Sequence, residues 1–428
     1  WTAFDLLPRC ADAPRYGFLI DFSADRSQFD LKWLTALHVN GLQFYDWMYR
    51  HERLLPPSLE YQDPLGRELS LQTGRRLIDS SHQRNIAAMP YTAIYGASPA
   101  FAASHPSWGL YDETGTLYDF ADGFLKIMNP ASGWRDHFVR ECQAVLKKLR
   151  FDGIHIDQYG EPQIGFDNTG QPVDLPSAIA GTIEAVRSAI PDRAAVVFNL
   201  VHNWPIEAMR GSPVDFLYSE LWSPMTSLGD LARVVTENRR ISGGKMPVIA
   251  VYIPPNYDHT VTMAQAVILA SGGYHLAHGE QGLYLCDPYF PKATEPSFEL
   301  ASTLKRLADF GVAFEEFLTF AEPVSVEATV DALLWIIPRR TFDYLVLNVL
   351  NVRSDAQWTD NLHPCPPKHH VTVRLEVTSP VEGIWMASPD DEAPAQPLQF
   401  CRTENCVTFV VPVVTTWALV WLKQKLAD

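Results

Sequence analysis

The chain has 428 residues, 47% of them hydrophobic, and its formal net charge is −16 at pH 7. A chain of this length and hydrophobic content can bury a large core, and we expect one large domain and one small one. The negative charge argues against nucleic acid or an anionic membrane as a partner, because either would need a basic surface.

No apolar run reaches the roughly 18 residues of a membrane span, and Trp1 opens no signal-peptide pattern. Compartment and oligomeric state stay open. The cysteines form no CxxC pair and no Cys/His cluster with metal spacing, so we expect neither a metal nor a cofactor. Most of them are predicted to be small buried side chains. Cys401 and Cys406 bracket RTEN in a predicted hairpin and form the one plausible disulfide.

Strand-like and helix-like segments alternate along the first three quarters of the chain. The predicted strands are near-continuous apolar runs at 15–23, 41–50, 85–96, 153–160, 194–204, 215–222, 246–255 and 273–280. The predicted helices are 28–39, 71–84, 134–150, about 176–190, a short one after 204, 228–240, 262–272 and about 296–317. Eight such units in about 300 residues predict a (β/α)8 TIM barrel of α/β class, whose strands are buried on both faces.

From about residue 320 the pattern changes to short β runs separated by turn residues, beginning with VSVEATVDALLWIIPR and FDYLVLNVLN. Because no helices lie between these runs, we predict a C-terminal all-β sandwich. The predicted domains are therefore residues 1–318 for the barrel and residues 319–428 for the sandwich.

The segment FDGIHIDQYG (151–160) is a short strand that ends in an acid. Ile154 and Ile156 face one side of it, while His155 and Asp157 face the other. In a TIM barrel, functional side chains lie at the carboxyl ends of the strands. Polar residues stand at several of these ends: Asp46, Asp157, Asn199, Glu220, His278 and Glu280.

Two of these acids are candidates for glycoside hydrolysis. Asp157 and Glu220 lie two strands apart, so their side chains can approach each other across the barrel mouth. In YSELW, Tyr218 and Trp222 share the face of Glu220, and desolvation by their rings could raise its pKa. We expect Asp157 to stay ionised in a more polar setting. This predicts Asp157 as nucleophile and Glu220 as acid/base.

The other candidates are predicted to bind sugar. Aromatic rings can stack on the apolar face of a pyranose, which marks Tyr45, Trp222 and Tyr252. Asp46 can bind a hydroxyl group or pair with Arg50, and Asn199 can bind the 2-hydroxyl group of the reacting sugar or cap a turn. His278 and Glu280 are either sugar ligands at the mouth or a structural pair. His155 lies deeper, and we expect it to be a satisfied core histidine.

Together the segments RYGFLIDF, FYDWMYRHE, FDGIHIDQYGE, VFNLVHNWPIE and YSELW resemble the motif series of glycoside hydrolase family 66. This family contains endo-dextranases and cycloisomaltooligosaccharide glucanotransferases. The resemblance covers residues 15 to about 280, and its nucleophile and acid/base positions fall on Asp157 and Glu220. It implies a retaining mechanism on α-1,6-glucans, with dextran or isomaltooligosaccharides as substrate, and it slightly favours an extracellular location.

The chain departs from this family pattern in two ways. It begins almost at the first strand, where family members usually carry an immunoglobulin-like domain, so we expect a trimmed or minimal member. Only NYDHTV (256–261) separates the seventh strand from its helix, where the cyclising transferases carry a carbohydrate-binding insertion. The second departure favours a dextranase-type hydrolase.

Three alternatives accompany this prediction. Within the enzyme class, the protein can act as a transglycosylase that makes cyclic or longer isomaltooligosaccharides. In another class, it binds glucan without cleaving it, although the presence of both carboxylates argues against this. A metal-dependent hydrolase is disfavoured because the chain has no HxH or HExxH spacing.

Overall fold

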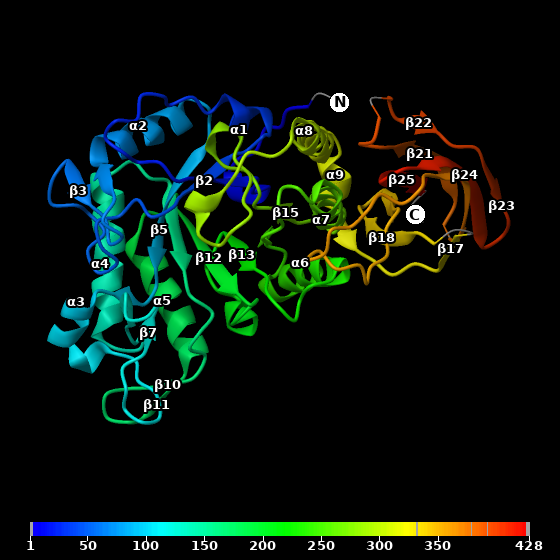
Figure 1. Ribbon diagram of the computed structural model, residues 1–428. Helices are drawn as coiled ribbons and strands as arrows, with labels where there is room; N and C mark the ends of the chain where they lie inside the picture. The colour runs from blue at the N-terminus through cyan, green and yellow to red at the C-terminus, as the bar shows by residue number, and fades with distance from the viewer. Residues whose placement is uncertain (1–2, 331–332, 378, 392, 425–428) are drawn as a thin grey trace.

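The structure is a computed structural model that describes residues 3–330, 333–377, 379–391 and 393–424. It has two regions, an N-terminal barrel and a C-terminal pair of antiparallel sheets that lies beside α6, α7 and α8 (Figure 1). None of its described helices combines the length and the apolar character needed to cross a lipid bilayer.

Eight parallel strands form the barrel, as predicted. In sheet order they are β1 (Tyr16–Leu19), β2 (Gly41–Phe44), β5 (Ala87–Ala93), β9 (Gly153–Asp157), β12 (Ala195–Val201), β13 (Phe216–Glu220), β14 (Pro247–Ala250) and β15 (Tyr274–His275). The seam between the last strand and the first is closed by the amide of Phe18, which donates to the carbonyl of His278 at 3.1 Å. Glycine is required there because a Cβ on Gly17 would lie 2.7 Å from the same carbonyl oxygen.

The predicted helices are also present, and most begin at a side-chain cap. They are α1 (Lys32–Ala36), α2 (Leu71–His82), α4 (Gly133–Lys148), α5 (Leu175–Ala189), the short η3 (Ile206–Met209), α6 (Leu228–Ser242), α7 (Asp258–Ala270), α8 (Phe298–Ala313) and α9 (Glu315–Leu318). Side chains of Ser70, Ser132, Asp174, Ser227 and Ser297 accept backbone amides at the first turns. The first helix is shorter than predicted. Asp30 accepts the amide of Lys32 at its start, and His38, with φ of 57°, ends it.

Four strand-to-helix connections carry extra structure at the carboxyl end of the barrel, and the one after β15 contains η4 (Glu280–Gly282) and η5 (Phe290–Lys292). β3 (Glu60–Gln62) and β4 (Glu68–Ser70) follow β2. β6 (Gly96–Ala97), α3 (Pro99–Ser104), η2 (Pro106–Trp108), β7 (Asp119–Phe120) and β8 (Leu125–Ile127) follow β5, and β10 (Gly165–Phe166) and β11 (Pro172–Val173) follow β9. Asp63, Asp112 and Asp167 organise three similar D-x-x-G turns, because one oxygen of each accepts the amides two and four residues later. No strand was predicted between residues 97 and 133.

The C-terminal region contains two antiparallel sheets, as predicted. The larger consists of β16 (Glu322–Pro323), β18 (Trp335–Arg340), β19 (Tyr344–Leu350), β25 (Trp417–Gln424), β21 (Val381–Ala387) and β22 (Gln396–Pro397). The smaller consists of β17 (Ala328–Val330), β20 (Lys368–Glu376), β24 (Cys406–Val414) and β23 (Phe400–Arg402). α9 ends at Leu318, and we keep the boundary between residues 318 and 319 as a proposal.

The larger sheet joins the sandwich to the barrel. On β19, Leu345 and Leu347 belong to the sandwich core, while Val346 and Leu350 belong to the barrel cluster, as period-two alternation requires. Trp417 has no exposed surface and packs edge-on against Phe310 of α8, with ring centroids 5.1 Å apart. The two regions therefore share one apolar interface.

The predicted disulfide is not formed. Cys401 on β23 pairs in register with Thr408 on β24, whereas Cys406 stands at the start of β24, opposite Glu376. All six cysteines are free thiols. The prediction was wrong because the hairpin register, rather than closeness in sequence, decides which side chains face each other.

Candidate active site

Asp157 and Glu220 end β9 and β13, and β12 lies between them. Asn199 of β12 bridges the two acids, because its amide nitrogen donates to Asp157 Oδ1 at 2.7 Å and to Glu220 Oε2 at 3.0 Å. Two oxygens that share one donor at these distances lie closer than the roughly 6.5–9.5 Å between the carboxyls of inverting glycosidases. The structure thus brings three sequence-predicted residues into one cluster.

Other donors reach the remaining carboxylate oxygens. The Tyr91 hydroxyl donates to Asp157 Oδ2 at 2.7 Å, and the Trp222 indole donates to Glu220 Oε1 at 3.0 Å. The Tyr252 hydroxyl also donates to Glu220. The sequence analysis missed Tyr91. In the pairing of β5 with β9, Ala93 is the partner of Asp157, and Tyr91 comes two residues before it. This pairing is not visible in the sequence, so no pattern connected Tyr91 with Asp157.

Both acids of the pair hold protons more tightly than free carboxyls. Burial raises the pKa of Asp157 to about 7, and the negative charge of Glu220 adds to the rise. Burial also raises the pKa of Glu220, although its hydrogen bonds oppose the rise. Asp157 has the polar contacts expected of it, from Tyr91 and Asn199, but burial outweighs them and raises its pKa. Two acids this close disfavour the doubly ionised state, so a proton shared between them is favoured.

His155 lies beneath Asp157 in the barrel and is a core residue, as predicted, but it is not fully satisfied because its Nε2 has no partner among the described residues. Its side chain is fully buried, its Nδ1 lies 3.1 Å from the Tyr16 hydroxyl, and its ring stacks between Tyr16 and Tyr91. Burial lowers the pKa of His155 to about 3. The ring is therefore neutral and adds no charge below the carboxylate pair.

Asp46 follows β2 at the same end of the barrel. Its backbone has φ of 52°, in the left-handed region that costs free energy for a residue with a side chain. The Arg67 guanidinium lies 3.4 Å from Asp46 Oδ2 and also binds Asp63. Burial raises the pKa of Asp46 to about 7 even though the Arg67 charge lowers it.

The ion pair weighed for Asp46 involved the wrong arginine. Arg50 instead donates to the carbonyl oxygens of Tyr49 and Gln62. The correct partner, Arg67, comes from the β3–β4 hairpin, which returns over the end of β2. This excursion was not predicted, so no sequence pattern connected Arg67 with Asp46.

Aromatic rings surround the pair on two sides. Tyr45 stacks on Phe290 with ring centroids 4.3 Å apart and packs against Tyr91 at 5.3 Å. Trp222 and Tyr252 lie 5.3 Å apart beside Glu220. The three predicted sugar-binding aromatics are therefore all placed around the carboxylates.

His278 and Glu280 are not brought to the carboxylate pair. Glu280 is buried, pairs with Arg26, and accepts the amides of Ile20 and Asp21 at 2.8 Å and 3.0 Å. The His278 side chain lines a small cavity with Leu269 of α7 and Gly311 of α8. Both residues belong to the segment that closes the barrel seam, where Glu280 anchors the end of β1.

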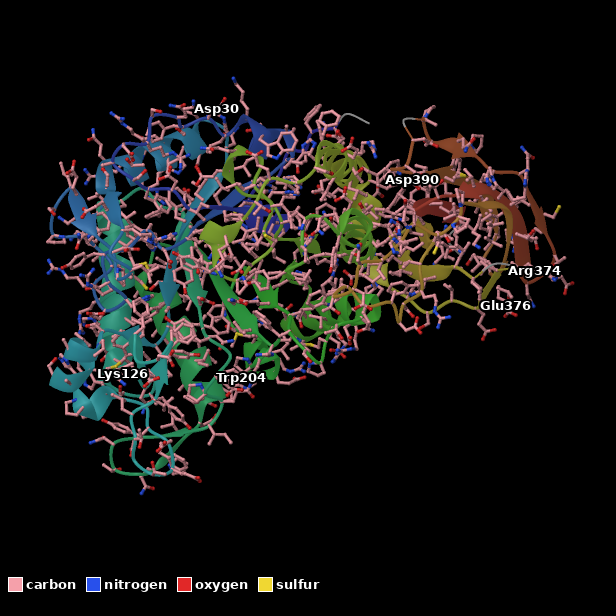
Figure 2. The ribbon with its side chains drawn as sticks, viewed as in Figure 1. Asp30, Lys126, Trp204, Arg374, Glu376 and Asp390 are labelled. Atoms are coloured by element: carbon pink, nitrogen blue, oxygen red, sulfur yellow. The ribbon has the colours of Figure 1, made fainter. Side chains whose placement is uncertain are left out.

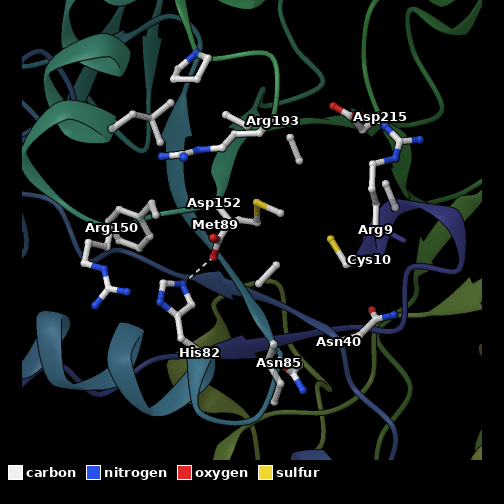
Figure 3. Close-up of a pocket in the computed structure, with 18 of the residues that line it drawn as sticks. Arg9, Cys10, Asn40, His82, Asn85, Met89, Arg150, Asp152, Arg193 and Asp215 are labelled. Carbon is white, nitrogen blue, oxygen red and sulfur yellow. Dashed lines mark hydrogen bonds and ion pairs between the residues drawn. The ribbon is translucent and has the colours of Figure 1, made fainter. Parts of the chain in front are cut away.

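A larger cavity, of about 1200 Å³, lies at the opposite end of the barrel, where β5, β9 and β12 begin. Figure 3 shows His82 pointing to Asp152 in this cavity, and their nearest atoms are 2.8 Å apart. Burial raises the pKa of the Cys10 thiol there to about 12, so it is not a thiolate at neutral pH. Because TIM barrels place their chemistry at the carboxyl ends of the strands, this cavity is not the candidate active site.

Within the described ranges, no three His, Cys, Asp or Glu side chains cluster as ligands of a metal ion. Asp157 and Glu220, which share one amide donor beside aromatic rings, are of the residue types that general acid and nucleophilic catalysis use.

Comparison with known proteins shows the family to which the chain belongs. The model of glycosyl hydrolase family 66 matches residues 2–421. A cycloisomaltooligosaccharide glucanotransferase of Niallia circulans is 21% identical over 611 residues, covering 100% of this chain and 63% of the relative. A second glucanotransferase of the same organism is 28% identical over 294 residues, covering 62% of this chain and 30% of the relative. The chain thus spans less than two thirds of these relatives.

Solved structures show the same fold. The cycloisomaltooligosaccharide glucanotransferase of Paenibacillus sp., solved with cycloisomaltoheptaose, superposes with a TM-score of 0.88 at 21% identity, covering 98% of this chain and 86% of that chain. A maltogenic α-amylase from Thermotoga neapolitana superposes with a TM-score of 0.64 at 12% identity, covering 97% and 99% of the two chains. The predicted arrangement of barrel and sandwich is confirmed.

Proposed function

Because the chain belongs to glycosyl hydrolase family 66, we propose that it is a retaining glycosidase that cleaves α-1,6-glucosidic linkages of dextran or isomaltooligosaccharides. The observation that carries the proposal is the Asn199 bridge between Asp157 and Glu220. It holds the two carboxyls within the short spacing that a covalent mechanism requires. The α-1,6 linkage is that of isomaltooligosaccharides, and the relatives carry the name cycloisomaltooligosaccharide glucanotransferase.

In the first step, Asp157 attacks the anomeric carbon and Glu220 protonates the departing glycosidic oxygen. The products are a β-linked glucosyl ester on Asp157 and a leaving chain with a free 6-hydroxyl group. In the second step, Glu220 removes a proton from water, which attacks the anomeric carbon and releases Asp157. Two inversions give an α-configured product, so configuration is retained.

The shared proton fits these roles. A glycosidic oxygen beside Glu220 accepts a hydrogen bond from the protonated carboxyl, which favours the proton on that side of the pair. Asp157 is then ionised and keeps its bonds from Tyr91 and Asn199, both of which favour its charged form. Substrate binding therefore leaves Asp157 as the nucleophile and Glu220 as the acid.

Asn199 has a further role in the proposal. Its amide nitrogen is used by both acids, but its buried oxygen has no partner among the described residues. An unpaired buried acceptor is costly unless a ligand satisfies it. In the proposal this oxygen accepts a hydrogen bond from the 2-hydroxyl group of the reacting glucosyl unit. The residues that bind the sugar around it are Asp46, Tyr45, Trp222 and Tyr252.

We place hydrolysis ahead of transglycosylation. Only residues 251–257 separate β14 from α7, which leaves no room for an inserted carbohydrate-binding module. The longer alignment runs over 611 positions against 428 residues in this chain, so the relative carries segments that this chain lacks. Transglycosylation remains the second candidate, because the printed names of both curated relatives are glucanotransferases.

A product profile tests the proposal. The protein is incubated with dextran, isomaltooligosaccharides, starch and pullulan, and Asp157→Asn serves as the control. Linear isomaltooligosaccharides from dextran are the expected products, whereas cyclic or longer products would favour the transferase. Release from none of the α-glucans would contradict the proposal and leave glucan binding alone.

A further inference from the structure

Phe120 is an aromatic residue at the barrel mouth with no part in the mechanism above. It ends β7, in the excursion between β5 and α4, and 41% of its surface is exposed. Lys126, on the neighbouring strand β8, and Trp204 are both labelled at the lower edge of the barrel in Figure 2. This is the end at which the strands carry Asp157 and Glu220.

One face of the Phe120 ring is fixed by the protein. It stacks on Tyr159 with centroids 4.3 Å apart and planes inclined by 18°. Tyr159 follows Asp157 by two residues and is itself held edge-on by Tyr95 at 5.4 Å. A Cβ on Gly96 would lie 2.7 Å from the Tyr159 hydroxyl, so glycine is needed for this packing. The stack therefore connects an exposed ring with the strand that carries Asp157.

The backbone beyond Phe120 is held in an uncommon conformation. Ala121 and Asp122 have φ of 52° and 54°, in the left-handed region that L residues rarely adopt. The Lys126 ammonium pairs with Asp119 at 3.1 Å across the same hairpin. Left-handed residues are usual in a tight β-hairpin turn, and here the amide of Phe124 donates to the carbonyl of Ala121 at 3.1 Å. The turn and the ion pair fix the end of β7 that carries Phe120.

We propose that Phe120 is a stacking platform for a glucosyl unit on the non-reducing side of the cleaved linkage. The proposal rests on the function proposed above. Phe120 belongs to the excursion that follows β5 and stacks on Tyr159, which follows β9. In sheet order β9, which carries Asp157, lies between β5 and β13, which carries Glu220, so Phe120 is on the side of Asp157 away from Glu220. Glu220 faces the leaving group, and the sugar chain beyond Asp157 is the part that keeps the non-reducing end.

The chemistry of the surface suits a glucose ring. The free face of Phe120 offers a flat apolar surface to the C–H groups of a pyranose, and the exposed carboxylate of Asp122 beside it can accept sugar hydroxyl groups. An α-1,6-linked chain is flexible, so a rigid ring that fixes one unit reduces the entropy still to be lost at the reacting centre. The platform would thus set the preferred length of the substrate.

The test uses 4-nitrophenyl α-isomaltooligosides in which the leaving group is constant and the glycone grows from one to five glucosyl units. For Phe120→Ala and Phe120→Leu we expect kcat/KM to fall about tenfold on the longer glycones and to stay unchanged on the shortest. Phe120→Tyr keeps a ring and should behave like the wild type. Phe342→Ala is the matched control, because Phe342 is 81% exposed and lies on the sandwich.

Equal loss on all glycones, or no loss on any, would overturn the platform. So would a Phe120→Tyr variant as impaired as Phe120→Leu. If the wild type released nitrophenol from none of these substrates, the proposed function would fail instead. The two failures are therefore distinguishable within one set of measurements.

Discussion

The hydroxyl of Tyr91 donates a hydrogen bond to Asp157 Oδ2 across 2.7 Å. This bond joins neighbouring strands, β5 and β9, at the point where the proposed nucleophile leaves the sheet. It stabilises the charged form of Asp157 and so opposes the effect of burial on its pKa.

Tyr91→Phe removes this donor and leaves the ring in place. A hydrogen bond to a charged group is worth about 1.5–3 kcal/mol, so we expect kcat/KM to fall about ten- to hundredfold. The pKa of Asp157 should rise, which moves the acidic limb of the kcat/KM profile to higher pH. An acidic limb that stays where it is in the wild type would show that Tyr91 does not act through Asp157.

Asp157→Asn should abolish activity and also change how stability depends on pH. The pKa of Asp157 is about 7 in the folded protein, against about 3.9 for an unperturbed aspartate. The folded state therefore binds this proton more tightly, and stability is lost as the pH rises from about 4 through 7. Asparagine has no proton to lose, so the Tm of the variant relative to wild type should be higher at pH 8 than at pH 5.

Asp112→Asn is the control for this measurement. Bonds from Thr114 and Thr116 lower the pKa of Asp112, so its carboxylate is ionised at both pH 5 and pH 8. The change in Tm caused by this variant should be the same at the two values. If Asp157→Asn behaved in the same way, the raised pKa of Asp157 would be wrong.

Arg67→Met should weaken substrate binding through Asp46. The Arg67 charge lowers the pKa of Asp46, so its removal raises that pKa and keeps the acid neutral over a wider pH range. A neutral carboxyl is a weaker acceptor for sugar hydroxyl groups, so the rise of KM on the acidic side should move to higher pH.

Arg50→Met provides the comparison, since Arg50 is the arginine that the sequence first linked with Asp46 and it contacts backbone carbonyls instead. It should leave the pH dependence of KM unchanged. A shift with Arg50→Met, or none with Arg67→Met, would refute the role assigned to the Arg67–Asp46 pair.

The sequence predicted the candidate site best where an apolar strand ends in a polar residue. Asp157 and Glu220 end apolar strands, so their positions followed from strand periodicity and from the rule that barrel sites lie at carboxyl ends. Helix periodicity also placed the start of α6 at Leu228, where the Ser227 side chain caps the first turn.

The contacts that the sequence did not predict depend on how the strands pair and on the long segments between a barrel strand and the next helix. Tyr91 and Arg67 reach the site through strand pairing and a hairpin that no local pattern reports. Glu280 was misjudged because its position after β15 resembles a site position, whereas its actual partners, Arg26 and the amides after β1, are distant in sequence. The raised pKa of Asp157 likewise depends on how closely the barrel encloses the pair.

The configuration of azide products tests most directly the roles of Asp157 and Glu220. Asp157→Gly and Glu220→Gly are each incubated with an activated aryl α-isomaltoside and sodium azide, and the glycosyl azide is identified by NMR. The account predicts a β-linked azide from Asp157→Gly, because azide replaces the nucleophile, and an α-linked azide from Glu220→Gly, because azide attacks the glucosyl ester. The reverse pattern, or variants that retain wild-type turnover without azide, would contradict it.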